Sequence, residues 1–319
     1  MTELADAVLL AAVAIGSVRA SSALGAARWP RRSPGSAILL WQALGLGGGL
    51  AAVGTLLDVG VMPQQGTTVA GGVVHVASAA ASGHLVPAGQ PAFLAILRLT
   101  SLAMGLALFA VLCWVLVASS VAVVRARRRQ RALLALLAHG DPKAPGALVV
   151  DHPTAAAYCL PGLRSQIVVS VGALDLLRPA ELAAVLAHER AHLRERHDLV
   201  VLPFTALRRA FGWSTICSEA HQSVALLIEM LADDRALRAR PAKALAGALA
   251  RFGTAGCGGN APAGALAASG ATREGEMAAR VTRILAPVPR LPAAARAGIC
   301  CSAILLVAVP VALLVLVPI

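Results

Sequence analysis

The stretch AHERAHLRERHD, residues 187–198, contains residues whose types and spacing could bind and activate a metal ion. On a helix, His188 and His192 are one turn apart, so both imidazoles can reach the same ion. Glu189 is offset by about 100° around the helix axis and can reach a water molecule on that ion. The pattern predicts a catalytic zinc site, with Glu189 as the general base in attack on a peptide carbonyl.

A catalytic zinc site needs a third protein ligand and an open fourth position. Glu229, in IEMLADDRAL, is one candidate, and Asp233 follows one helical turn later, where it could hydrogen-bond a ligand histidine. Apolar neighbours indicate that this stretch is partly buried, and burying two carboxylates without a cation is costly. Asp198 is the other candidate, but a single-motif site ending there needs glycine where Glu195 stands. His197 is out of register for that motif.

The same residues have other interpretations. Three arginines are interleaved with the motif, as they would be on a plain solvated helix face: Arg190, Arg194 and Arg196. A purely structural zinc would be closed by a fourth ligand. Candidates for that ligand are Asp198, Cys217 and His221. The alternative function is therefore a catalytically silent membrane receptor or scaffold, with a structural metal or none.

A zinc peptidase also needs a donor for the negative charge that develops on the substrate oxygen. Tyr158 and His221 are candidates for this role. Each also has an ordinary interpretation, as a tyrosine packed in a strand and a histidine on a helix surface.

The elements that position these residues belong to a chain that is largely apolar. Of 319 residues, 58% are hydrophobic and only 14% are charged, which indicates several membrane spans. Because about 20 apolar residues cross a bilayer as a helix, we expect four spans, at about 5–26, 37–57, 99–124 and 297–319. The first contains Arg19, which could reach the inner interface; a signal peptide is the alternative. Glycines at 45 and 47–49 would let another helix approach the second span closely.

The basic residues predict the orientation of these spans. Arginines cluster at 28–32, between the first two spans, and at 125–131, after the third. Since Lys and Arg remain on the cytoplasmic side, the N-terminus and the 58–98 loop are expected outside. The net charge of +12 is then explained by topology and lipid contact, and no nucleic-acid partner is expected.

The fold class predicted is a mainly α membrane protein, with a cytosolic α+β zincin-like domain inserted between the third and fourth spans. Its parts would be a membrane domain, 1–131, a metallopeptidase domain, 132–296, and a last span, 297–319. Charged residues around the motif make its helix too polar to lie in hydrocarbon, which excludes cleavage within the bilayer.

Within 132–296, local patterns predict a short helix at 132–139 and then strands in ALVVDHP, AAAYCLPG and QIVVSVGAL. Helices are expected from Pro179 through His192, at 219–238 and at 276–285. Between the first two, LVVLPF and Trp213 are expected against the membrane face. The Gly/Ala-rich stretch 253–273 is expected to be a flexible loop.

LLRPAELAAVLAHERAHLRERHD, followed by EMLADDRAL, resembles the gluzincin membrane metallopeptidases. The resemblance is to the BlaR/MecR antirepressor peptidases, and more distantly to HtpX-like proteases and CAAX prenyl endopeptidases. It implies zinc on His188, His192 and Glu229, with Glu189 as base. VVDHPTAAAYCLPGLRSQIVVSVGAL is similar to the strands that precede the zinc helix in that family. The chain departs from the BlaR/MecR pattern in lacking a C-terminal penicillin-binding sensor domain, so beta-lactam sensing is not expected.

The function predicted is that of an integral membrane zinc endopeptidase at the cytosolic face. Its partners would be the lipid bilayer and a protein or peptide substrate, such as a cytosolic transcriptional repressor. The resemblance favours regulatory proteolysis of a repressor-like or membrane protein.

Overall fold

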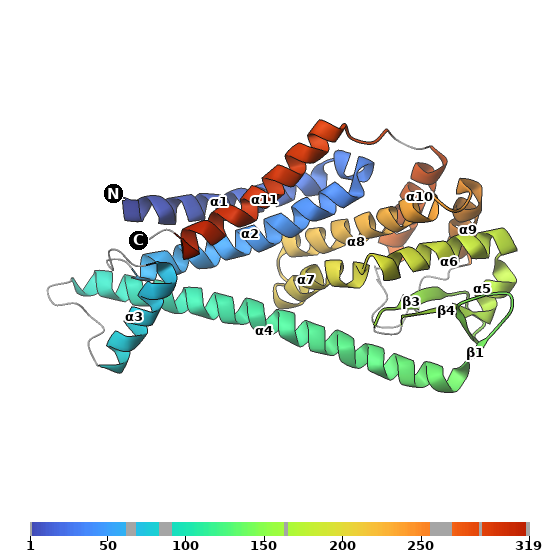
Figure 1. Cartoon of the computed structure of the whole chain (residues 1–319), viewed down its shortest axis with the longest axis horizontal. Helices are drawn as coiled ribbons and strands as arrows, with labels where there is room; N and C mark the ends of the chain where they lie inside the picture. The colour runs from blue at the N-terminus through green and yellow to red at the C-terminus, as the bar shows by residue number, and fades with distance from the viewer. Residues whose placement is uncertain are drawn as a thin grey trace. The chain divides into compact units, whose positions relative to one another are not determined.

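The computed structural model describes residues 2–61, 68–82, 91–162, 165–255, 270–286 and 289–316 (Figure 1). The chain divides into two compact units. The first consists of Met1–Val115 and Leu291–Ile319, and the second of Leu116–Arg290. Both are mostly helical, and the second also contains a small mixed sheet.

The first unit contains the apolar helices. In chain order its elements are α1 (Thr2–Ala26), the 3-10 helix η1 (Trp29–Arg32), α2 (Pro34–Val61), α3 (Val69–Ala81), the first half of α4 (Ala92–Leu137) and α11 (Ala293–Val315). Among the described residues, α1, α2, α4 and α11 are long and apolar enough to cross a membrane. Large apolar side chains of this unit are exposed, including Trp114 at 72%. These features support membrane association.

Two expectations in this region differ from the structure. No separate helix forms at 132–139, because α4, which contains the expected span 99–124, continues to Leu137 and is followed by β1 (Ala138–Gly140). The arginines and leucines after 124 are good helix formers, so nothing in that stretch interrupts the helix. The 58–98 segment is also not simply a loop, because it contains α3. The side chain of Thr68 caps this helix by accepting a hydrogen bond from the backbone N–H of Gly71.

Close helix packing confirms the expectation for two glycines of α2. A side chain at Gly47 would collide with the backbone of Leu306 in α11, and one at Gly48 would lie 2.8 Å from the Cβ of Ser17 in α1. Gly45, in contrast, borders open space. The glycines at 47 and 48 therefore allow the backbones of these helices to approach closely.

The sheet of the second unit has the strand order β1-β2-β4-β3. Its strands are β1 (Ala138–Gly140), β2 (Leu148–Val150), β3 (Ala157–Leu160) and β4 (Gln166–Ser170). Strands β2 and β4 are parallel, whereas β1 and β3 pair antiparallel at the two edges. β2, β3 and β4 lie in the three predicted stretches, while β1, which contains His139, occupies a position predicted to be helical.

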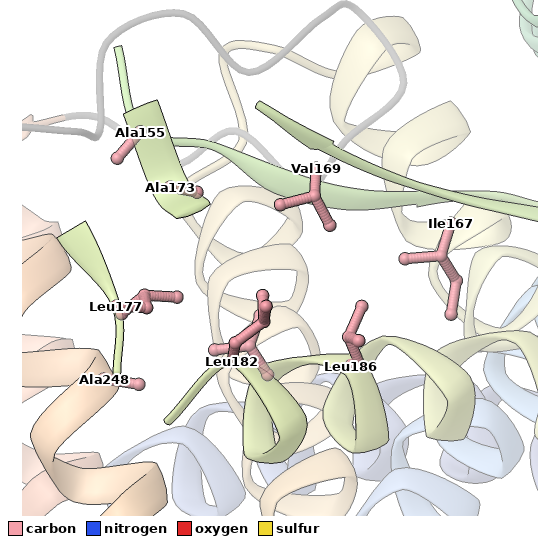
Figure 2. Close-up of a cluster of buried hydrophobic side chains, with 9 residues drawn as sticks. Ala155, Ile167, Val169, Ala173, Leu177, Leu182, Leu186 and Ala248 are labelled. Atoms are coloured by element: carbon pink, nitrogen blue, oxygen red, sulfur yellow. The ribbon is translucent and has the colours of Figure 1, made fainter. Parts of the chain in front are cut away.

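Helices cover the sheet and complete the second unit: α5 (Val171–Leu176), α6 (Pro179–Arg194), α7 (His197–Ala210), α8 (Thr215–Ala236), α9 (Ala242–Thr254) and α10 (Gly270–Leu285). Leu182 and Leu186 of α6 pack beneath Ile167 and Val169 of β4 (Figure 2). This core fixes the rotation of α6 about its axis. Most of the expected flexible loop, from 256 to 269, lies outside the described residues.

Candidate metal centre

Helix α6 presents the two motif histidines on one buried face. It begins at Pro179, as the sequence predicts. Leu182 and Leu186 face the sheet, and a different side of α6 contacts α8. His188 and His192 are both buried there, each 7% exposed.

The two imidazoles meet the carboxylate of Glu229, which comes from α8. Nε2 of His188 lies 3.0 Å from Nε2 of His192. The Glu229 oxygens are 3.3 Å from the first of these nitrogens and 3.5 Å from the second. Among the described residues, these three form the one group of His, Cys, Asp or Glu whose ligand atoms are arranged to hold a metal ion, all within 4.8 Å of one another.

Asp233 lies one turn after Glu229 and behind the group. Its Oδ1 is 3.0 Å from Nδ1 of His188, and its side chain is almost completely buried. His188 therefore directs Nε2 at His192 and Glu229, while its Nδ1 lies against the carboxylate of Asp233. This is the position expected from the four-residue spacing of the two acids.

Glu189 lies beside the group rather than in it. Its carboxylate lies close enough to the thiol of Cys159, on β3, for each group to shift the pKa of the other. Burial raises the pKa of Glu189, the positive charge of His188 lowers it and Glu229 raises it again, giving a pKa of about 7. Burial, and then the charge of Glu189, raises the pKa of the Cys159 thiol. Sequence reasoning did not find Cys159, because the contact depends on β3 lying against α6.

A second residue that sequence reasoning missed lies behind His192. His197, at the start of α7, has its Nδ1 3.1 Å from Nδ1 of His192, and only 2% of its surface is exposed. Its Nε2 is 3.3 Å from Glu195, which forms an ion pair with Arg235. The sequence motif excluded His197 as a ligand; the structure places it against His192, a candidate ligand.

Arg280, from α10, is the third missed residue. Its guanidinium donates two hydrogen bonds of 2.8 Å to Asp233, and Nη1 lies 2.9 Å from Oε2 of Glu229. Sequence analysis inferred a metal partly because two buried carboxylates need a cation. Arg280 is such a cation, so burial of Glu229 and Asp233 does not by itself require a metal.

The group nevertheless carries excess negative charge. Glu189, Glu229 and Asp233 supply three carboxylates against one guanidinium, which leaves two negative charges when all are ionised and the histidines are neutral. Burial lowers the pKa of His188, but Asp233 and Glu229 raise it more, so the net shift is upward. Burial raises the pKa of Glu229 and Arg280 lowers it, and the net shift is strongly downward. The potential at the group therefore favours cations.

The remaining candidates from the sequence are not part of this group. Asp198 forms an ion pair of 2.9 Å with Arg127, near the end of α4. Tyr158 packs with Leu134 on the face of β3 opposite to Cys159. The pKa of His221 is lowered to about 4 by burial and then by the charge of Arg208.

The expected helices around the site are confirmed with small shifts at their ends. α8 begins at Thr215 rather than 219, because the side chain of Ser214 caps it, and it ends at Ala236. The expected LVVLPF segment lies within α7, and Trp213 follows this helix with 85% of its surface exposed.

Residues 124–234 match the model of Peptidase family M48. The matched segment contains both histidines, Glu189, Glu229 and Asp233, whereas Arg280 lies beyond it. Comparisons with curated proteins and with solved structures gave no match. The family match and the His188, His192 and Glu229 group together support a metallopeptidase of the zincin type.

Proposed function

We propose that this chain is an integral membrane zinc-dependent endopeptidase. Zinc would be held by His188, His192 and Glu229, and Glu189 would be the general base. The observation that carries the proposal is the convergence of three ligand atoms from two helices at one buried point.

The geometry of the group fits zinc. Four donors at about 2.1 Å in a tetrahedron lie about 3.4 Å from one another. Nε2 of His188 lies 3.0 Å from Nε2 of His192 and 3.3 Å from Oε2 of Glu229, while Oε1 of Glu229 lies 3.5 Å from Nε2 of His192. With one atom from each residue, the three ligand atoms lie within 4.8 Å of one another. Two imidazoles and one carboxylate form a donor set typical of catalytic zinc, and three ligands leave a fourth position for reactants. When the carboxylates are ionised and the histidines neutral, the two excess negative charges also match a divalent cation.

Each residue then has a chemical task. When bound, zinc supplies Lewis-acid polarisation of the scissile carbonyl and makes water more acidic. Glu189 accepts the proton that the attacking water loses and can return it to the leaving amine. Asp233 holds the ring of His188 in the orientation that directs Nε2 at the ligand group.

A peptide substrate fits the surroundings of Glu189. β3 is an edge strand whose described partner is β4, and it lies against α6. An extended peptide would add to the edge of β3 that faces away from β4 by backbone hydrogen bonds. This mode of binding would bring a peptide carbonyl close to Glu189, which already contacts Cys159 on the same strand.

We place the reaction at the cytosolic face. α4 is about 69 Å long at 1.5 Å per residue, more than twice the hydrocarbon thickness of a bilayer. Its C-terminal part therefore extends beyond the bilayer, and the arginines at 125–131 mark the cytosolic exit. The substrate would be a repressor-like protein or a membrane protein, cleaved for regulation.

The substitution Glu189→Gln tests the proposal. We expect the purified full-length variant in detergent to bind zinc stoichiometrically and to lose hydrolysis of a reporter peptide. Glu219→Gln, on the exposed start of α8, is the matched control and should retain hydrolysis. Undiminished cleavage by Glu189→Gln would overturn the enzymatic proposal, and zinc binding without cleavage in the wild type would favour the silent receptor.

A further inference from the structure

The contact between His192 and His197 determines how the two rings must be protonated. The ring centroids lie 4.8 Å apart with an interplanar angle of 87°, and the contact joins the Nδ1 atoms. Two nitrogens 3.1 Å apart form a hydrogen bond when one carries the proton and the other offers a lone pair.

A ligand role for His192 decides which nitrogen carries that proton. Its Nε2 faces Glu229 and His188, so this atom must offer its lone pair to a metal. Its Nδ1 must then carry the proton and donate it to Nδ1 of His197.

The same logic fixes the state of His197. Because its Nδ1 accepts, a neutral His197 must carry its proton on Nε2. That nitrogen lies 3.3 Å from Oε2 of Glu195, a carboxylate oxygen that can accept it. The other oxygen of Glu195 pairs with Arg235. Every donor along this series of contacts therefore has an acceptor.

We propose that His197 is a positioning residue for the metal ligand His192, holding it in the Nδ1–H tautomer. The inference rests on the proposed function. It gives the two ligand histidines different supports, since a charged carboxylate backs His188 and a neutral imidazole backs His192.

The local backbone places His197 for this role. α6 ends at Arg194 and α7 begins at His197, so only two residues join the helices. Arg196 makes the turn in the left-handed conformation, with φ of 50°. The ion pair between Asp198 and Arg127 then holds the first turn of α7 against α4.

Zinc affinity of the full-length protein in detergent, measured by chelator competition, tests the proposal. His197→Phe keeps the ring volume and removes the acceptor, so we expect zinc affinity to fall about 10–100-fold. His197→Asn places an amide oxygen near the position of Nδ1 and should restore most of the affinity. His221→Phe, a half-buried histidine of α8 outside the group, is the matched control and should bind zinc as the wild type does.

The outcomes separate this inference from the proposed function. Wild-type zinc affinity in His197→Phe, or equal losses in the Phe and Asn variants, would overturn the positioning role and leave the peptidase proposal intact. Absence of zinc binding by the wild type would instead overturn the proposed function. If His197→Phe does not fold, nitrogen-15 NMR of histidine-labelled wild type decides, because the proposal requires an Nε2–H signal that His197→Asn lacks.

Discussion

Arg280 and Asp233 form a bidentate ion pair beneath the candidate metal centre. Nε donates to Oδ2 and Nη2 to Oδ1, both at 2.8 Å, and Asp233 has no exposed surface. Through this pair, α10 supports the carboxylate that lies 3.0 Å from Nδ1 of His188. The stability of the second unit without metal should therefore depend on Arg280.

We expect Arg280→Gln to lower the free energy of unfolding of the metal-free protein by about 3–5 kcal/mol, because it leaves buried carboxylates without their cation. Denaturant titration in detergent with a chelator present would measure the loss. Arg283→Gln is the matched control, since Arg283 also forms a bidentate pair, through Nη1 and Nη2, with the less buried Asp234. It should cost about 1 kcal/mol or less. Equal losses would contradict a special role for Arg280.

Two adjacent aspartates allow a sharp test of support for His188. Asp233→Asn should weaken zinc binding about 10–100-fold, because a neutral amide no longer holds the Nδ1 proton of His188 with a charge. Asp234→Asn should leave zinc affinity within about two-fold of wild type, although it also breaks an ion pair between α8 and α10. Chelator competition measures both variants. An unchanged affinity in Asp233→Asn would argue against the support of His188 by this carboxylate.

Removing the metal should affect both activity and stability. A chelator should abolish peptide hydrolysis and lower the melting temperature, and added zinc should restore both. At zinc concentrations about 1,000 times Kd, binding to the native state stabilises it by about 4 kcal/mol. Glu229→Ala should melt at the same temperature with and without zinc. Hydrolysis that persists in chelator would count against a metallopeptidase.

Replacing Arg196 by glycine should stabilise the folded protein. A non-glycine residue in the left-handed region costs about 1–2 kcal/mol, and glycine avoids that cost but loses more entropy on folding. We expect Arg196→Gly to stabilise the protein by up to about 1 kcal/mol, since the only side-chain hydrogen bond described for it, to Gly162, is long at 3.5 Å. Arg194→Gly, at an exposed helical position, should instead destabilise by about 1 kcal/mol. Denaturant titration measures the free energy of unfolding of both variants. A lower stability of Arg196→Gly would contradict backbone strain at Arg196.

Local patterns predicted much of the helical structure and part of the site. The four apolar runs form helices, and Pro179 begins the motif helix. The prediction of a separate helix at 132–139 was wrong. No helix-breaking residue separates this stretch from the preceding span, so α4 continues through it to Leu137. β1 was missed because Ala138–Gly140 becomes a strand only by pairing with β2.

The sequence by itself determined that His188 and His192 share a helix face, with Glu189 beside them, because those positions follow from the helical repeat alone. For the third member of the group it offered Glu229, which it favoured, and Asp198. Only the tertiary structure decided this, since packing of α6 on the sheet and on α8 brings Glu229 to the imidazoles while Arg127 pairs with Asp198. Arg280 and His197 likewise reach the centre through contacts between helices or across a turn, which no local periodicity encodes.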